Sequence, residues 1–197
     1  ERVYLNKRNG KGKEYYYDDK LEFEGEYLNG ERNGKGKEYY YNGKLRFEGE
    51  YLNGEKWNGI GYSINDNVEY EIKEGKGNIK EYNYNGELRF EGEYLNGKRN
   101  GKKYNYYGKL IFEGELLKGQ RNGKGKEYYN NGNLRYKGNY LNGKKWNGKG
   151  YNIKGSMEYE IKDGKGNIKE YNDDGILSYE GEYLNGEING KGKEYNY

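Results

Sequence analysis

The chain is built on a short segment that returns along most of its length. Residues 23–30 read FEGEYLNG, and the same or nearly the same letters return at residues 47–54, 90–97, 112–119 and 179–186. A period in the low twenties, without a helix-length apolar pattern, predicts a repeat array in which each unit packs only against its neighbours. If one position per unit is used as a marker, successive markers lie 19 to 24 residues apart, at Tyr4, Tyr27, Tyr51, Tyr70, Tyr94, Leu116, Tyr140, Tyr159 and Tyr183.

A longer duplication lies on top of this period. Residues 51–101 recur as residues 140–190, 89 positions later, and the match includes both tryptophans, Trp57 and Trp146. We therefore expect residues 1–197 to form a single repeat array of about eight hairpin units with one internal duplication.

The pattern inside a unit predicts strands and tight turns. Residues 45–51 alternate between apolar or glycine positions and charged positions, as on a strand with one apolar face. Asn-Gly pairs at 42–43 and 53–54 favour hairpin turns because both residue types tolerate positive φ. The sequence thus predicts an all-β fold, an elongated single-layer antiparallel meander of repeated β-hairpins.

Composition indicates what fills the core of such a sheet. Only 31% of the residues are hydrophobic, which is low for a folded chain, but 17% are aromatic and 28 are tyrosine. Disordered chains are poor in aromatic residues, so we expect an ordered protein. Tyrosine buries a large ring while its hydroxyl stays bonded or wet, which suits the thin core of a one-layer sheet.

The repeated spacing also matches a known family pattern. The spacing F-x-G-x-Y-x-x-G-x-x-x-G-x-G resembles the MORN repeat (membrane occupation and recognition nexus), in particular its bacterial-type variant with a Tyr-x-Asn-Gly-Lys-Leu turn. The resemblance implies a hairpin array used for scaffolding, dimerisation, or contact with lipid or protein. The chain departs from the pattern where Val68 and Met157 replace a leading glycine and where tyrosine or leucine replaces tryptophan. Phe23, Gly25, Tyr27, Gly30, Gly34 and Gly36 carry the first complete match.

Catalytic chemistry has little support in these residues. The chain has no histidine or cysteine, so serine hydroxyls lack the usual activating base and zinc lacks its usual ligands. Carboxylate pairs such as Glu48 and Glu50 recur in most units, which is typical of a solvated charge ladder. The acidic pairs at 18–19 and 173–174 occupy turn positions, so turn chemistry accounts for them. We expect no enzyme, no catalytic residues, no cofactor and no metal site.

Charge limits the classes of partner. With 36 basic and 33 acidic residues the net charge is +3, and glutamates interrupt the basic runs, which argues against nucleic acid. Lipid head groups have only weak support, because the chain has no polybasic cluster of four or more residues.

The favoured function is a scaffold for protein-protein interaction or self-association. The binding surfaces would be a concave aromatic face or exposed strand edges, including Gly190–Tyr197, which resembles a strand without its hairpin partner. The alternatives are a secreted or surface binder that stacks sugars or lipid head groups on Tyr and Trp, and an antitoxin-like inhibitor. Candidate binding residues are the aromatic side chains of the two lengthened units, Trp57, Tyr62, Trp146 and Tyr151.

Overall fold

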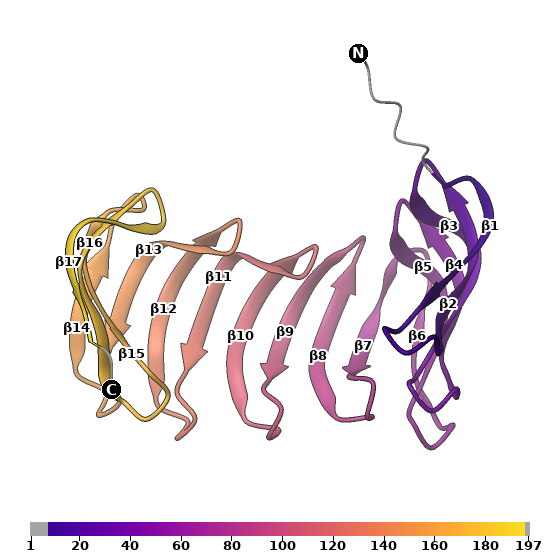
Figure 1. The fold of residues 1–197 in the computed structure, drawn as a ribbon, viewed down its shortest axis with the longest axis horizontal. Coiled ribbons are helices and arrows are strands. Elements are labelled where there is room, and N and C mark those ends of the chain that lie inside the picture. Colours follow the sequence, from indigo (N-terminus) through magenta and orange to yellow (C-terminus); the bar gives the residue numbers. More distant parts are fainter. Residues whose placement is uncertain (1–7, 196–197) are drawn as a thin grey trace, which may run out of the picture. The chain divides into compact units, whose positions relative to one another are not determined.

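A computed structural model describes residues 8–195, and all regular structure in that range is β. Tyr4, expected to mark the first unit, lies outside the described residues. The chain divides into two units, with the boundary between Gly97 and Lys98. Within each sheet, neighbouring strands are antiparallel and consecutive in the chain, as the predicted meander requires (Figure 1).

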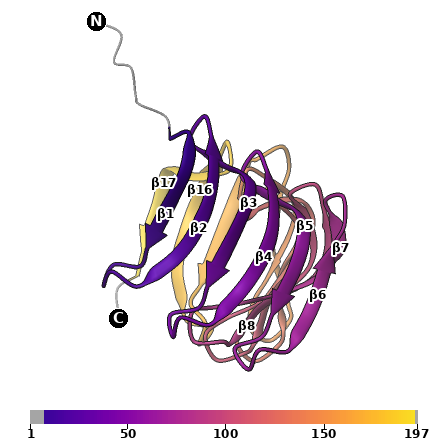
Figure 2. The same ribbon diagram turned by 90° about the vertical axis from the view of Figure 1, so that its right-hand side faces the viewer.

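The first unit holds eight strands. Six of them form one sheet in chain order, which Figure 2 shows side by side, and the last two pair with each other. The strands are β1 (Gly10–Tyr15), β2 (Leu21–Leu28), β3 (Glu31–Tyr39), β4 (Leu45–Leu52), β5 (Glu55–Tyr62), β6 (Val68–Ile72), β7 (Lys76–Tyr82) and β8 (Leu88–Leu95).

The second unit holds nine strands, of which the first six pair in chain order and the last three form a separate sheet. β17 is the outermost strand of that sheet and pairs with β16, while residues 196–197 lie outside the described range. The strands are β9 (Lys98–Tyr104), β10 (Leu110–Leu117), β11 (Gln120–Tyr128), β12 (Leu134–Leu141), β13 (Lys144–Tyr151), β14 (Met157–Ile161), β15 (Gly166–Tyr171), β16 (Leu177–Leu184) and β17 (Glu187–Glu194).

Two kinds of turn connect the strands. At Asn53 and Gly54, φ is 51° and 82°, so both turn residues are left-handed, as a two-residue hairpin turn of this type requires. The turn at Asn42 differs, because only Gly43 has positive φ and the loop is closed by Tyr40, whose amide donates to the Lys44 carbonyl at 2.8 Å. The Asn53-Gly54 pair therefore makes a two-residue turn, whereas Asn42-Gly43 belongs to a three-residue turn.

A row of glycines crosses the sheets where strands pair most closely. Gly25 faces Gly36, and Gly36 faces Gly49 on the next strand. A Cβ built on Gly36 would lie 2.6 Å from the Phe23 ring, so the glycines leave the space that the aromatic rings occupy. This is the reason for a glycine in the middle of each FEGEY strand.

The short 19-residue step interrupts the sheet. Between β6 and β7 the hairpin closes with a single bridge, between Lys73 and Lys76, and the ladder continues no further. Ile72 faces Gly59 and Ile79 faces Gly92, so these two buried isoleucines take positions that glycine holds in other hairpins. The duplicated step between β14 and β15 repeats this arrangement with a bridge between Lys162 and Lys165.

Candidate interaction surfaces

One face of the six-stranded sheet in the first unit, which we call the ring face, carries Phe23, Tyr27, Phe47 and Tyr51. The Phe23 ring meets the rings of Tyr27 and Tyr51 edge to face, with centroids 5.7 and 5.3 Å apart. Phe23 and Phe47 are fully buried. Because the sheet is one layer thick, something other than a second sheet must cover them.

Basic side chains provide that cover. The Arg32 guanidinium lies 3.9 Å from the centroid of the Phe23 ring, and the Lys56 ammonium lies 4.3 Å from that of Phe47. Their aliphatic stems exclude water while the cations face the rings, an arrangement that is favourable in itself. The ring face is thus closed by side chains of the same sheet.

A buried carboxylate holds these cations in place. Glu38 on β3 bonds to Arg32 at 2.8 Å and to Arg46 and Lys56 at 3.0 Å each, with its side chain 5% exposed. Burial by itself would raise the pKa of Glu38, but the charges of Lys56, Arg46 and Arg32 outweigh it and hold the pKa far below its usual range. Glu38 therefore stays ionised at the centre of a three-cation cluster.

The second unit repeats the cluster 89 positions later. Glu127 bonds to Arg121 and lies 3.7 Å from Lys145, whose ammonium also contacts Glu170 at 2.7 Å. Burial opposes ionisation of Glu127, yet Lys145 and Arg121 lower its pKa. Lys145 lies 5.1 Å from the centroid of the buried Tyr136 ring, which replaces Phe47. Each half of the duplication has its own ion cluster over its own rings.

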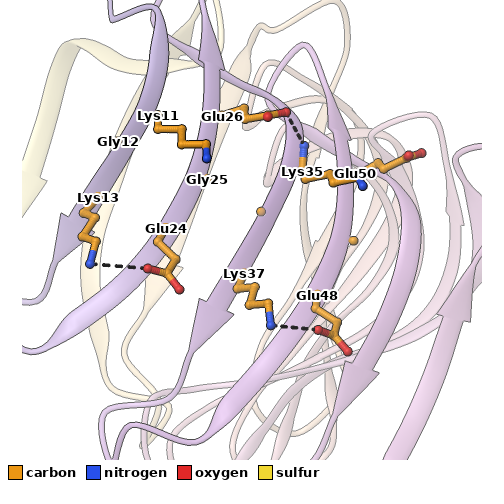
Figure 3. A pocket seen from close by; sticks show the side chains of 12 residues that line it. Lys11, Gly12, Lys13, Glu24, Gly25, Glu26, Lys35, Lys37, Glu48 and Glu50 are labelled. Atoms are coloured by element: carbon orange, nitrogen blue, oxygen red, sulfur yellow. Dashed lines mark hydrogen bonds and ion pairs between the residues drawn. The ribbon is translucent and has the colours of Figure 1, made fainter.

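The opposite face of β1–β4, which we call the charge face, holds a shallow groove of about 750 Å³. Two rows of charged side chains form its walls, and the backbone of the glycine row forms its floor (Figure 3). Lysines on β1 and β3 alternate with glutamates on β2 and β4, and ion pairs of 3.4 and 3.3 Å join Lys13 to Glu24 and Lys37 to Glu48. The lining residues are Lys11, Gly12, Lys13, Glu24, Gly25, Glu26, Lys35, Gly36, Lys37, Glu48, Gly49 and Glu50.

Comparison with known families agrees with this geometry. The family model described as the MORN repeat matches residues 23–44, 90–102, 112–134 and 179–196, and the MORN repeat variant matches residues 8–29. The chain contains MORN repeats. A search of curated proteins found no match to it. MORN repeats commonly mediate protein or membrane-lipid interactions and are generally not catalytic.

On the charge face, the hairpins β2–β3, β10–β11 and β16–β17 also fix their two glutamates differently, as the first of them illustrates. The first, Glu24, accepts a hydrogen bond from the Tyr39 hydroxyl at 2.8 Å, and burial together with this bond raises the pKa of Tyr39 to about 12. The second, Glu26, accepts the backbone amide of Lys35 at 2.9 Å beside the left-handed Gly34, where the strand register shifts. The predicted charge ladder is therefore also a set of structural bonds.

The four predicted binding residues lie on β5 and β13. The register shift between Glu50 and Tyr51 leaves Trp57 without a residue opposite, so Trp57 lies at a β-bulge. Trp57 is half-buried, and its indole lies against the next turn, where a Cβ built on Gly75 would come within 2.8 Å of the ring. Trp146 takes the same place against Gly164.

Tyr62 and Tyr151 lie at the other ends of these strands. The Tyr62 hydroxyl donates to Glu48 at 3.0 Å, and its carbonyl accepts from the buried Tyr40 at 2.7 Å. The Tyr151 carbonyl likewise accepts from Tyr129 at 2.8 Å. The predicted tryptophan and tyrosine of each strand therefore lie toward opposite ends of that strand and do not form one site.

The ion clusters were missed by the sequence interpretation, although a signal was present. Glu38 is two residues after Gly36 and four after Gly34 on the same strand. Alternate residues of a strand share a face, so the Glu38 side chain had to point toward the rings. Shifted pKa values often mark catalytic sites, but structural ion networks shift them too. Glu38 and its partners are buried on the ring face, away from the groove, and the cluster is duplicated, so we assign it to the fold.

Two other features bear on function. Within residues 8–195, no helix is long and apolar enough to cross a membrane. In the same range, acidic side chains do not gather in a group of three or more that could hold a metal ion.

Proposed function

We propose that this MORN repeat protein is a non-enzymatic scaffold that binds an extended segment of a protein partner on the charge face. The groove across β1–β4 supports the proposal, because its backbone floor is open and its walls repeat the same pair of a lysine strand and a glutamate strand. The ring face offers less, since Arg32 and Lys56 already cover its aromatic rings.

The alternation of charge in the groove supports recognition of a charged, extended partner. Lysines line the walls on β1 and β3, and glutamates line them on β2 and β4. A partner with both signs of charge can exchange the exposed pairs for its own at small cost, because each surface ion pair contributes only about 0.2–1 kcal/mol. Complementary charge of this kind contributes more to specificity and association rate than to affinity.

The same alternation favours self-association as the second candidate. A two-fold axis parallel to the strands, placed between β2 and β3, would bring the lysines of β1 against the glutamates of β4 in a second copy. The lysines of β3 would likewise meet the glutamates of β2, so the surface complements itself, as an isologous dimer requires. Association of this kind should weaken as salt increases.

A crosslinking experiment tests the proposal. A photoreactive amino acid at Lys37, in the groove wall, is compared with one at Asn42, an exposed turn residue outside the groove. We expect the Lys37 probe to join one defined protein segment, or a second copy, that the Asn42 probe does not join. That segment, made as a peptide, should bind the chain and lose binding when Glu24→Lys reverses the charge of the wall.

The proposal fails if both probes join the same proteins, or if the Lys37 probe joins only glycan or lipid. Those last two products would instead favour a binder of sugars or lipid head groups.

We also propose that Trp57 and Trp146 contribute to partner binding. Both are half-buried at bulges, and aromatic residues of this size dominate interface energies.

A further inference from the structure

The internal duplication allows the charge faces of the two units to be compared position by position. In the first unit, Lys37 on β3 faces Glu48 on β4, which faces Ile60 on β5. Eighty-nine positions later, Lys126 on β11 faces Lys137 on β12, and Lys137 faces Lys149 on β13. Three lysines on adjacent strands thus replace a lysine, a glutamate and an isoleucine.

A second substitution enlarges the difference. Asn139 on β12 faces Lys124, whereas Glu50 faces Lys35 at the equivalent place in the first unit. Lys124, Lys137 and Lys149 are exposed, and their ammonium groups form no ion pair with the part of the chain that the structure describes. Only Lys126 has a carboxylate partner, Glu113 at 3.4 Å. We call Lys124, Lys126, Lys137 and Lys149 the lysine strip.

The lysine strip works against the stability of the sheet. Like charges directly opposite each other on neighbouring strands are destabilising, and the equivalent positions of the first unit show that this backbone accepts opposite charges. Because the ring face beneath is buried and closed by an equivalent ion cluster in both halves, packing does not require the lysines. We propose that the lysine strip is a binding site for an extended, acidic protein segment with carboxylates at alternate residues.

The spacing of the strip fits such a segment. Lys124 and Lys126 are two residues apart on one strand, so their side chains leave the same face about 6.6 Å apart. Carboxylates at alternate residues of an extended peptide have the same separation. Lys137 and Lys149 continue the positive charge onto the next two strands, about 4.8 Å apart.

Acidic residues limit the width of the strip. Glu113 on β10 lies opposite Lys126, and Glu160 on β14 lies opposite Lys149, so carboxylates border it on both sides. The positive surface is therefore three strands wide, on the order of 14 Å. A nucleic acid or an anionic membrane would bring phosphates against the bordering carboxylates, whereas a single extended peptide fits between them.

Exchange of residues between the two units tests the site. The first variant gives the strip the residues of the first unit, Lys137→Glu, Asn139→Glu and Lys149→Ile. The reciprocal variant, Glu48→Lys, Glu50→Asn and Ile60→Lys, builds a strip in the first unit. Each unit already tolerates the exchanged residues at equivalent positions, and thermal melting checks that both variants fold. If the triple exchange does not fold, Lys137→Gln alone replaces it.

The probe is a fluorescent peptide of alternating glutamate and serine, and the control peptide alternates lysine and serine. We expect the parent chain to bind only the acidic peptide, and to bind it more weakly as salt increases. The first variant should bind it about tenfold more weakly, the loss expected when the exposed ion pairs of two lysines are removed. The reciprocal variant should bind a second equivalent of peptide.

Three results would overturn the site: equal affinity of the parent and the first variant, no gain in the reciprocal variant, or tighter binding of a single-stranded oligonucleotide or of anionic vesicles at the same lysines. The inference rests on the proposed function only in naming a protein segment as the ligand. If the Lys37 probe joins no defined segment but the acidic peptide still binds the lysine strip, the proposed function of the groove is wrong and the lysine strip remains supported.

Discussion

At the scale of single residues, two buried glutamates link the basic side chains to the rings that they cover. Glu38 and Glu127 each hold basic side chains over buried rings, and both are nearly inaccessible to solvent. An ion pair in such a place is not by itself stabilising, because desolvation offsets the attraction. Removing one partner is costly, however, since it leaves the other charges buried and unpaired.

Removing the carboxylate of Glu38 should be costly even if the complete ion cluster adds little stability. Glu38→Gln should lower the free energy of unfolding of the first unit by about 3 kcal/mol or more, because Arg32 and Lys56 lose their counter-ion. Glu50→Gln, on the exposed charge face, should cost less than about 0.5 kcal/mol. Urea unfolding followed by circular dichroism measures both. Equal effects of the two substitutions would show that the cluster does not hold the ring face closed.

The lowered pKa values of Glu38 and Glu127 predict a loss of stability in acid. A carboxyl group whose pKa is lower in the folded state stabilises the fold above its unfolded pKa of about 4.3, and the stabilisation disappears as pH falls below that value. Melting temperature should therefore drop steeply between about pH 4 and pH 2. The variant with both glutamates changed to glutamine should show a shallower drop, and an identical slope would contradict the assignment.

Substitution of the two tryptophans separates binding from packing. If Trp57 and Trp146 are binding residues, Trp57→Ala and Trp146→Ala should each weaken binding of the crosslinked partner segment by about 2 kcal/mol and leave the melting temperature nearly unchanged. Calorimetric titration and thermal melting give the two quantities. A sharp fall in melting temperature with unchanged affinity would mean that each indole serves only to pack against Gly75 or Gly164.

At the scale of strands and turns, the close pairing of glycines sets the geometry of each hairpin. A Cβ built on Gly49 would lie 2.0 Å from the Asn58 carbonyl oxygen and 2.6 Å from the Gly59 Cα, both backbone atoms of the paired strand. Those atoms cannot move away without loss of ladder hydrogen bonds. The row of glycines is therefore as necessary to the sheet as the rings that it accommodates.

Gly49→Ala should accordingly destabilise the first unit by about 2 kcal/mol, near the middle of the range for overpacking. Glu48→Ala, on the neighbouring residue and the opposite face, is the matched control and should cost under about 1 kcal/mol, the limit for an exposed ion pair. Thermal melting of the two variants measures the difference. If Gly49→Ala melts with the parent, the close approach of β4 and β5 is not essential.

The strands and most turns could be predicted from the sequence because their signals are local. Alternation of apolar and charged residues over 45–51 predicts the two faces of the strand. Asn53-Gly54 predicts a hairpin turn, and the backbone adopts that turn. The break between β6 and β7 could not be predicted in this way, since it depends on how buried Ile72 and Ile79 pack and on a ladder that stops at Lys73.

The candidate surfaces were less predictable than the fold. The bulge at Trp57 depends on the register of β4 and β5, and the groove beside Lys37 depends on which strands become neighbours. The lysine strip is spread over three strands, β11 to β13, so it forms no run in the sequence. Counting basic residues along the chain therefore could not find it.

At the scale of the whole chain, the protein contains duplicated MORN repeats, and each half of the duplication closes its own ring face. The two halves share their buried clusters and differ on the charge face, where the first is balanced and the second carries unpaired lysines. In an array of this kind, stability is approximately a sum of local contributions from each repeat and its neighbours. We propose that residues 1–197 still form a single array.

Hydrogen exchange measured by mass spectrometry shows whether the two cores close separately. We predict two maxima of backbone protection 89 residues apart, one at the strands around Glu38 and one at those around Glu127, with lower protection at the breaks after β6 and β14. Glu38→Gln should remove the first maximum and leave the second. Protection that declines steadily from one end of the chain, or a loss of both maxima in Glu38→Gln, would contradict two separately closed cores.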